Sequence, residues 1–276
     1  MKKITKTKVT KRKKTTKTKK KIDFSAIKKS VDQALKKTTK PEEKTTSKVK
    51  KVTTGIEGLN EALSGGYPEK SLVIVSGSTG AGKSTFAMQF LIDGANKGEN
   101  GVYITLEEEP AHLIKDFEDF NWDIKKLVDE NKIIITKPAI YKFEPLLETI
   151  KNTVERSEAK RLVIDSSSLL SVYFENPFEV RRGLAELDKK IKKLNITTLA
   201  ISEIMEESHL LSTTGVEEFI ADGVIVLHII KNENEYTRAL SVRKMRSIEH
   251  SLKIMPMQIT KNGIIVYPKE EVFSEV

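Results

Sequence analysis

The stretch Leu72-Val-Ile-Val-Ser-Gly-Ser-Thr-Gly-Ala-Gly-Lys-Ser-Thr85 decides the fold of this chain. The apolar run Leu72–Ser76 predicts a buried strand, and Ser84–Asn96 predicts a helix. Three glycines between them let the backbone turn sharply from one element into the other. A strand, a glycine-rich turn and a helix in direct succession are typical of an α/β domain.

The turn fits the pattern G-x-x-x-x-G-K-[ST] of a Walker A phosphate loop. Its backbone N–H groups and the N-terminus of the following helix favour bound phosphate. We therefore expect ATP to bind with Mg²⁺, Lys83 reaching the β and γ phosphates and the Ser84 hydroxyl holding the metal. The expected nucleotide-binding residues are Gly77, Ser78, Thr79, Gly80, Ala81, Gly82, Lys83, Ser84 and Thr85.

Short apolar runs alternate with amphipathic segments, which predicts a mainly parallel sheet flanked by helices. Further strands are expected at Val102–Leu106, Lys132–Thr136, Leu162–Asp165 and Thr197–Ile201. Further helices are expected at Ala111–Phe120, Glu144–Arg156 and Phe178–Leu194. Beyond residue 221 the runs Gly223–Ile230, Arg238–Lys244, Leu252–Ile259 and Gly263–Tyr267 follow closely without helices, which predicts an antiparallel extension of the sheet.

Acidic residues follow two of the predicted strands. Asp165 ends an apolar strand, where a Walker B carboxylate would orient the water shell of Mg²⁺. The run Glu107-Glu108-Glu109 follows another strand at the edge of the sheet where ligands bind, so these residues are candidates for polarising water. Asp165 also fits an ordinary strand end, and the glutamates fit a solvated turn or a helix cap behind Pro110.

Several motifs together resemble KaiC domains of the RecA/RadA ATPase superfamily. They occur in the order of that family over about residues 52 to 268. Besides the phosphate loop they are Thr54-Gly-Ile-Glu-Gly-Leu-Asn-Glu-Ala-Leu63, Gly65-Gly66, Leu106-Glu-Glu-Glu-Pro110, Gly215-Val-Glu-Glu-Phe-Ile-Ala-Asp222-Gly and Lys244-Met-Arg246. The resemblance implies a RecA-like core with a slow regulatory ATPase activity.

The resemblance also assigns roles to individual residues. It implies that Glu107 and Glu108 act on the attacking water and that Asp165 is the Walker B acid. Lys244 and Arg246 match a Lys-x-Arg pair that the family extends to the γ-phosphate of a neighbouring subunit's ATP, which implies a ring, expected to be a hexamer. From the residues alone, this pair also fits the exposed face of a strand. The family commonly continues with Gly-Thr, where this chain has Ser247-Ile248.

Autokinase activity is disfavoured by the same comparison. Family domains that phosphorylate themselves carry Ser or Thr just before the late strand, where this chain has Glu217-Glu218-Phe219. Ser212, Thr213 and Thr214 lie nearby and stay open as alternatives, although they also fit an ordinary loop.

The positive charge of the chain belongs to its N-terminal segment. Residues 1–51 carry 20 lysines and one arginine against four acidic residues, a net charge of +17, so the remaining residues carry −8 of the total of +9. We expect a disordered basic tail at 1–21, a short amphipathic helix and linker at 22–51, and an ATPase domain at 52–276. The tail could contact nucleic acid non-specifically, act as a solubilising extension, or dock on an acidic partner.

Composition excludes other classes of protein. The chain has no cysteine and only four scattered histidines, so thiolate and structural zinc sites are not expected. It lacks an apolar run of the length that spans a bilayer and an apolar segment behind its basic start, so we expect a cytoplasmic protein. Two hypotheses stay beside the slow ATPase switch: an ATP-controlled nucleic-acid-binding protein of the RadA recombinase-paralogue type, and a signalling protein that recruits partners in its ATP state.

Overall fold

The computed structural model describes most of the chain beyond residue 48. The described residues are 49–138, 142–166, 168, 173–174, 176–205, 210–232, 235–270 and 272. The expected basic tail and the amphipathic helix lie outside them.

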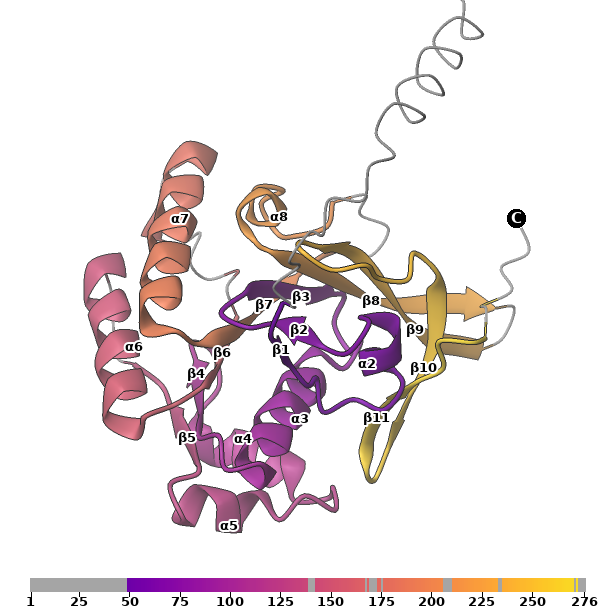
Figure 1. Cartoon of the computed structure of the whole chain (residues 1–276), viewed down its shortest axis with the longest axis horizontal. Coiled ribbons are helices and arrows are strands. Elements are labelled where there is room, and N and C mark those ends of the chain that lie inside the picture. The colour runs from indigo at the N-terminus through magenta and orange to yellow at the C-terminus, as the bar shows by residue number, and fades with distance from the viewer. Residues whose placement is uncertain are drawn as a thin grey trace, which may run out of the picture. The chain divides into compact units, whose positions relative to one another are not determined.

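A nine-stranded sheet forms the centre of the fold, with the strand order β11-β10-β9-β8-β3-β7-β6-β4-β5 (Figure 1). Its strands are β3 (Leu72–Gly77), β4 (Gly101–Thr105), β5 (Ile133–Thr136), β6 (Arg161–Asp165), β7 (Thr197–Glu203), β8 (Gly223–Asn232), β9 (Glu235–Met245), β10 (Ile254–Thr260) and β11 (Gly263–Val266). The six strands β3, β4, β5, β6, β7 and β8 run parallel to one another, and β9, β10 and β11 add an antiparallel extension beside β8. The mainly parallel sheet and its C-terminal extension are therefore confirmed.

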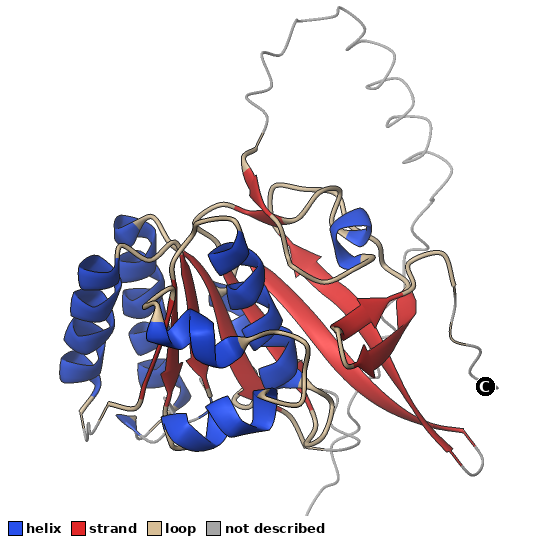
Figure 2. Ribbon diagram, turned by 90° about the horizontal axis from the view of Figure 1, so that it is seen from below, coloured by secondary structure: helices blue, strands red, loops and turns tan. Residues whose placement is uncertain are grey.

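Helices cover the two faces of this sheet (Figure 2). The helices α3 (Lys83–Asn96), α4 (Pro110–Phe117) and α5 (Ile124–Asp129) share one apolar core with the sheet, and α6 (Phe143–Ser157) and α7 (Pro177–Leu194) share a second. The central strand β3 is buried along its whole length because it has a strand on each side and helices near both faces. This burial is typical of an α/β sheet and accounts for its uninterrupted apolar sequence.

Short elements and exact boundaries differ from the sequence-based expectations. The expected helix at 111–120 ends earlier, at Phe117, and the expected strand at 197–201 continues to Glu203. Five elements were not predicted, because each is too short to show a periodic pattern. They are α5, α2 (Leu59–Ala62), α8 (Glu217–Ile220) and the paired strands β1 (Lys51–Val52) and β2 (Tyr67–Pro68).

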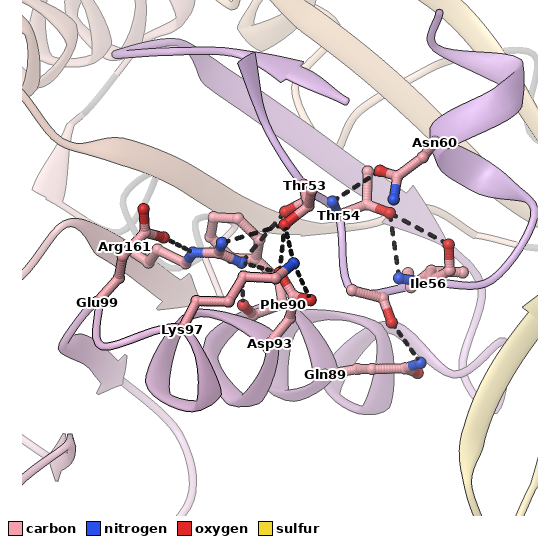
Figure 3. A network of polar contacts seen from close by, with 11 residues as sticks. Thr53, Thr54, Ile56, Asn60, Gln89, Phe90, Asp93, Lys97, Glu99 and Arg161 are labelled. Carbon is pink, nitrogen blue, oxygen red and sulfur yellow. Dashed lines mark hydrogen bonds and ion pairs between the residues drawn. The ribbon is translucent and has the colours of Figure 1, made fainter. Parts of the chain in front are cut away.

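A buried arginine fastens the far end of α3 to the sheet (Figure 3). Arg161, at the start of β6, is only 1% exposed and lies within 2.9 Å of Asp93 and 2.7 Å of Glu99. Its guanidinium also donates to the carbonyls of Thr53 and Phe90 and lies over the Phe90 ring. The cluster thus joins the residues before α2, the helix α3 and the strand β6.

The charge of Arg161 also acts on its carboxylate partner. Burial raises the pKa of Asp93, but hydrogen bonds from Lys97 and Thr53 and the charge of Arg161 outweigh burial, so the pKa lies below its ordinary value. A carboxyl group with a depressed pKa in the folded state stabilises the fold at neutral pH, and this stabilisation is lost as the pH falls through that pKa.

We expect Arg161→Met to lower the free energy of unfolding by roughly 3 kcal/mol at neutral pH, because it removes one partner from a buried ion-pair network. Urea unfolding of the full chain measures this change. The adjacent and exposed Lys160 provides a matched control, since Lys160→Met should change stability by no more than about 0.5 kcal/mol. Equal effects of the two substitutions would contradict the role given to the Arg161 cluster.

Candidate functional site: a phosphate loop facing acidic residues

The predicted phosphate loop joins β3 to α3 in the expected geometry. Gly80 and Gly82 have φ angles of 79° and 97°, a region of backbone conformation that favours glycine. A Cβ on Gly77 would lie 2.7 Å from the carbonyl oxygen of Leu227 on β8, so a larger residue does not fit there. These constraints hold the backbone in a tight loop at the N-terminus of a 14-residue helix.

The side chain of Lys83 folds over this loop and contacts its backbone. Its side chain is almost fully buried, and Nζ donates to the Ser78 carbonyl at 3.0 Å and lies 3.8 Å from Glu203. Burial lowers the pKa of Lys83, while the charges of Glu203 and Asp165 act in the opposite direction. The ammonium is therefore an incompletely solvated cation beside the loop, which favours an anionic ligand.

Asp165, the expected Walker B acid, and Ser84 of the loop are in direct contact. Ser84 Oγ donates to Asp165 Oδ2 at 3.0 Å, and the Tyr103 hydroxyl of neighbouring β4 donates to the same oxygen. Burial raises the pKa of Asp165, although the hydrogen bonds from Tyr103 and Ser84 lower it. A hydroxyl and a carboxylate oxygen in contact are ligands that suit Mg²⁺, which usually takes its other ligands from water and phosphate. These residues fit the metal expected with the nucleotide.

The three consecutive glutamates divide into two groups. Glu107 accepts a hydrogen bond from Ser166 Oγ at 2.7 Å, and the backbone of Glu108 is fixed by the Thr105 hydroxyl. Glu109 instead pairs with Lys137 at 2.8 Å and directly precedes α4, where its side chain makes no capping hydrogen bond. Only the first two glutamates face the phosphate loop.

A cleft of about 400 Å³ brings these groups together. One side is lined by the phosphate loop and the start of α3, and the other by Glu107, Glu108 and Asp165. Among the remaining loop residues, Ser78 holds Lys83 through its carbonyl and Ala81 is fully buried, so they shape the cleft rather than line it. A larger cavity of about 610 Å³ lies around Asn100 and Arg156 at the other end of the parallel strands, away from these groups.

Three residues around the loop were not predicted from the sequence. Glu203 lines the cleft at the end of β7, and Ile259 of β10 lines it beside Gly82. Arg238 of β9 donates from Nε to the Gly80 carbonyl at 3.2 Å. All three come from strands far along the chain, so the register of the sheet is needed to place them beside the loop. For Glu203 alone the sequence offered a signal, because a predicted strand two residues longer would have placed it at the strand end.

Lys244 and Arg246 lie at the opposite end of the sheet from the phosphate loop of the same chain. In the ladder of β3 and β8, Val73 pairs with Gly223 and Gly77 pairs with Leu227, whereas Lys244 of β9 pairs with Val224 near the first of these ends. The structure therefore does not bring this pair to the chain's own cleft.

The two cations instead hold the C-terminal end of α8. Lys244 Nζ donates to the Glu218 and Ala221 carbonyls, each at 2.7 Å, and Arg246 donates to the Phe219 carbonyl at 3.1 Å. Burial and the nearby Arg246 lower the pKa of Lys244, with the carboxylates of Asp222 and Glu218 opposing them. A cation at the end of a helix interacts favourably with its free carbonyls.

The residue after this pair explains the departure from the family pattern. Ser247 has a φ of 68°, which lies in the left-handed region. Glycine reaches this region without steric cost, and the family commonly has glycine here. The serine keeps the glycine-like turn.

None of the described helices is long and apolar enough to cross a membrane.

Comparisons with known proteins identify the family of this chain. The family described as "ATPase: KaiC" matches residues 52–271. A UPF0273 protein of Thermotoga maritima is 34% identical over 80% of this chain and 97% of its own length, and one of Methanocaldococcus jannaschii is 36% identical over 79% and 96%. The circadian clock oscillator protein KaiC of Synechococcus elongatus is 33% identical over 79% of this chain, which spans only 44% of that protein.

A solved structure supports the same assignment. The crystal structure of a KaiC-like protein from the hyperthermophilic archaeon Pyrococcus horikoshii is 40% identical, with a TM-score of 0.73 over 80% of this chain and 100% of its own. The RecA-like fold and the resemblance seen in the sequence motifs are thus confirmed. The chain belongs to the KaiC family of ATPases.

Proposed function

We propose that this protein hydrolyses Mg·ATP slowly, as a regulatory switch whose sites are shared between subunits. The observation that carries the proposal is the cleft in which Lys83 and the Ser84–Asp165 pair face Glu107 and Glu108. A phosphate-binding loop opposite carboxylates provides both the electrostatic stabilisation and the water-orienting groups that phosphoryl transfer to water needs.

Each group has a distinct role in this proposal. The loop amides and Lys83 would bind the phosphates, and Ser84 with Asp165 would hold the metal. Magnesium, when bound, neutralises charge on the β and γ phosphate oxygens. Glu107 and Glu108 orient a water molecule towards the γ-phosphorus and accept its proton as the bond to the leaving oxygen of ADP breaks. Ser166 keeps Glu107 turned towards this position.

The position of Lys244 and Arg246 supports a shared site. Because they lie at the far end of the sheet from their own loop, they can contact a nucleotide only on another subunit. We therefore infer an oligomer, expected to be a hexameric ring, in which this pair contributes positive charge to the neighbour's γ-phosphate as an arginine finger does.

The alternative of a nucleic-acid-controlled ATPase makes a different prediction. We expect DNA to leave the steady-state ATP hydrolysis rate within about twofold, because residues 48–276, with 30 basic and 35 acidic side chains, carry a net charge of −5. The measurement compares the full chain with a chain beginning at Lys48, where the compact unit begins, each with and without DNA. Strong stimulation that survives removal of the first 47 residues would contradict the switch proposal and favour a recombinase-like role.

We also propose that residues 1–51 are separate from the ATPase domain and serve as a basic extension. Binding of DNA by the full chain alone, abolished by moderate salt, would identify residues 1–47 as an electrostatic tether.

A further inference from the structure

The connection between β7 and β8 passes from the nucleotide end of the sheet to the Lys244/Arg246 end. β7 ends at Glu203, beside the phosphate loop, while β8 begins at Gly223, opposite the start of β3. Between these strands the structure describes 204–205 and 210–222. Apolar side chains of this connection, Ile204, Val216 and Ile220, pack against the core that α7 shares. The described part thus contacts both functional ends of the subunit.

At the nucleotide end, Thr213 fastens the connection to Glu203. Thr213 Oγ1 lies 2.6 Å from the Glu203 carbonyl and within hydrogen-bond distance of the hydroxyls of Ser168 and Ser202. A carbonyl only accepts, so the single hydroxyl proton of Thr213 goes to Glu203 and the two serines donate to Thr213. The Glu203 amide in turn donates to Ser168 at 2.8 Å. The backbone of Glu203 therefore moves together with Thr213.

In the middle, a buried carboxylate organises the turn before α8. Glu217 is 2% exposed and accepts a hydrogen bond from the Thr214 hydroxyl at 2.6 Å. Ser212 Oγ also lies 2.6 Å from Glu217 and contacts the Glu218 carboxylate, so the two carboxylates share its single proton. It also accepts from the backbone amides of Thr214 and Val216. So many donors on one carboxylate fix the residues next to Thr213 to the first residue of α8.

At the other end, α8 binds Lys244 and Arg246, the two cations proposed to contact the neighbour's nucleotide. Lys244 is held by two carbonyls of this segment, and the Arg246 guanidinium is held by the Phe219 carbonyl and lies 3.4 Å from Asp222. Asp222 is itself fixed to the start of β3, since its carboxylate accepts from the Leu72 amide and its amide donates to the Leu72 carbonyl. A shift of α8 would change where both cations point.

We propose that Thr213 and Glu217 are positioning residues that couple the phosphate occupancy of a subunit's own loop to the placement of the Lys244/Arg246 pair it offers to its neighbour. The starting event is competition for Lys83, because a triphosphate on the loop repels the Glu203 carboxylate that lies 3.8 Å from this ammonium. Glu203 then moves with Thr213, and α8 follows. The inference rests on the proposed shared site. It adds that Lys244 and Arg246 of a subunit reach the neighbour's nucleotide best when the subunit's own loop has bound ATP.

Mixed oligomers test this coupling. The acceptor subunit carries Arg246→Ala, so its intact loop depends on cations from a donor. One donor carries Glu107→Gln and Glu108→Gln, which leaves its loop able to bind ATP without turnover, and the other donor carries Lys83→Ala, which empties its loop. With donor in large excess, ATP turnover per acceptor subunit should be about five- to tenfold higher with the first donor, a typical size for coupling between sites.

Thr213→Val identifies the route. Added to the donor that binds ATP, Thr213→Val should lower ATP turnover per acceptor subunit to the level seen with the Lys83→Ala donor. Added to the Lys83→Ala donor, it should change this turnover by less than about twofold, because coupled effects are not additive. Thr213 is exposed, so the substitution leaves the core intact. Thr153→Val on α6 makes the same chemical change away from the connection and should leave the rescue unaltered.

The outcomes separate the inference from the function on which it rests. Equal rescue by the two donors, or the same loss from Thr213→Val in both, would overturn the coupling while leaving shared sites in place. No rescue by either donor, with mixed assembly shown by native mass spectrometry, would overturn the shared site itself and the coupling with it.

Discussion

Replacing Glu107 and Glu108 together by glutamine lowers the ATP turnover of this protein by about 100-fold or more, the range expected when a group that accepts a proton is removed. Glutamine keeps the size of the side chain and its hydrogen bond from Ser166, but it cannot take the proton of the attacking water. Nucleotide binding should persist, because Lys83, Ser84 and Asp165 are unchanged. Single-turnover hydrolysis and the binding of a fluorescent ATP analogue measure the two properties separately.

Glu109 provides the matched control for this prediction. It is the third glutamate of the same run, yet its carboxylate pairs with Lys137 rather than facing the cleft. Glu109→Gln should therefore change turnover by no more than about threefold. A loss as large as that of the double variant would show that the run acts through its total charge, and the proposed division of roles would be wrong.

Arg246→Ala should lower turnover by about 1000-fold, the scale on which an arginine finger acts on phosphoryl transfer. Its loop and acidic residues remain intact, so ATP should still bind. Addition of Lys83→Ala subunits should restore part of the activity, because the intact loop of one variant then meets the intact cations of the other. ATP turnover of each variant alone and of their mixture measures this rescue.

Arg243 lies three residues before Arg246, on β9, and is exposed, which makes Arg243→Ala the control for loss of a positive charge. It should retain turnover within about threefold. Absence of rescue in the Arg246→Ala mixture, once mixed assembly has been verified, would mean that the sites are not shared.

The sequence predicted those parts of the site that local chemistry encodes. The phosphate loop could be identified because a buried strand, three required glycines and a helix start fall within 14 consecutive residues. Asp165 and the two glutamates followed from strand ends, since the carboxyl ends of parallel strands lie along one edge of the sheet. The long helices were found for a similar reason, because their apolar faces repeat over three or more turns.

Other parts depend on contacts that no local pattern carries. Glu203 reaches Lys83 only because β7 lies beside β3 in register, 126 residues apart at the pairing of Gly77 with Glu203. The role of α8 depends on its backbone carbonyl groups, which accept hydrogen bonds from Lys244 of β9 and from Arg246 just after that strand. Every residue has a carbonyl group, so the sequence carries no sign of these contacts. A four-residue helix also shows too little periodicity to be recognised.

In the proposed shared site, the placement of the loop and the cation pair at opposite ends of β3 and β8 would give each subunit a donor side and an acceptor side. Association through two different surfaces is heterologous, so an open chain of subunits always leaves one loop without cations and one cation pair without a loop. Only closure completes every site. If the sites are shared as proposed, hydrolysis per subunit would report the closure of the assembly, and a subunit diluted below the dissociation constant of the assembly would have all its own groups yet no complete site.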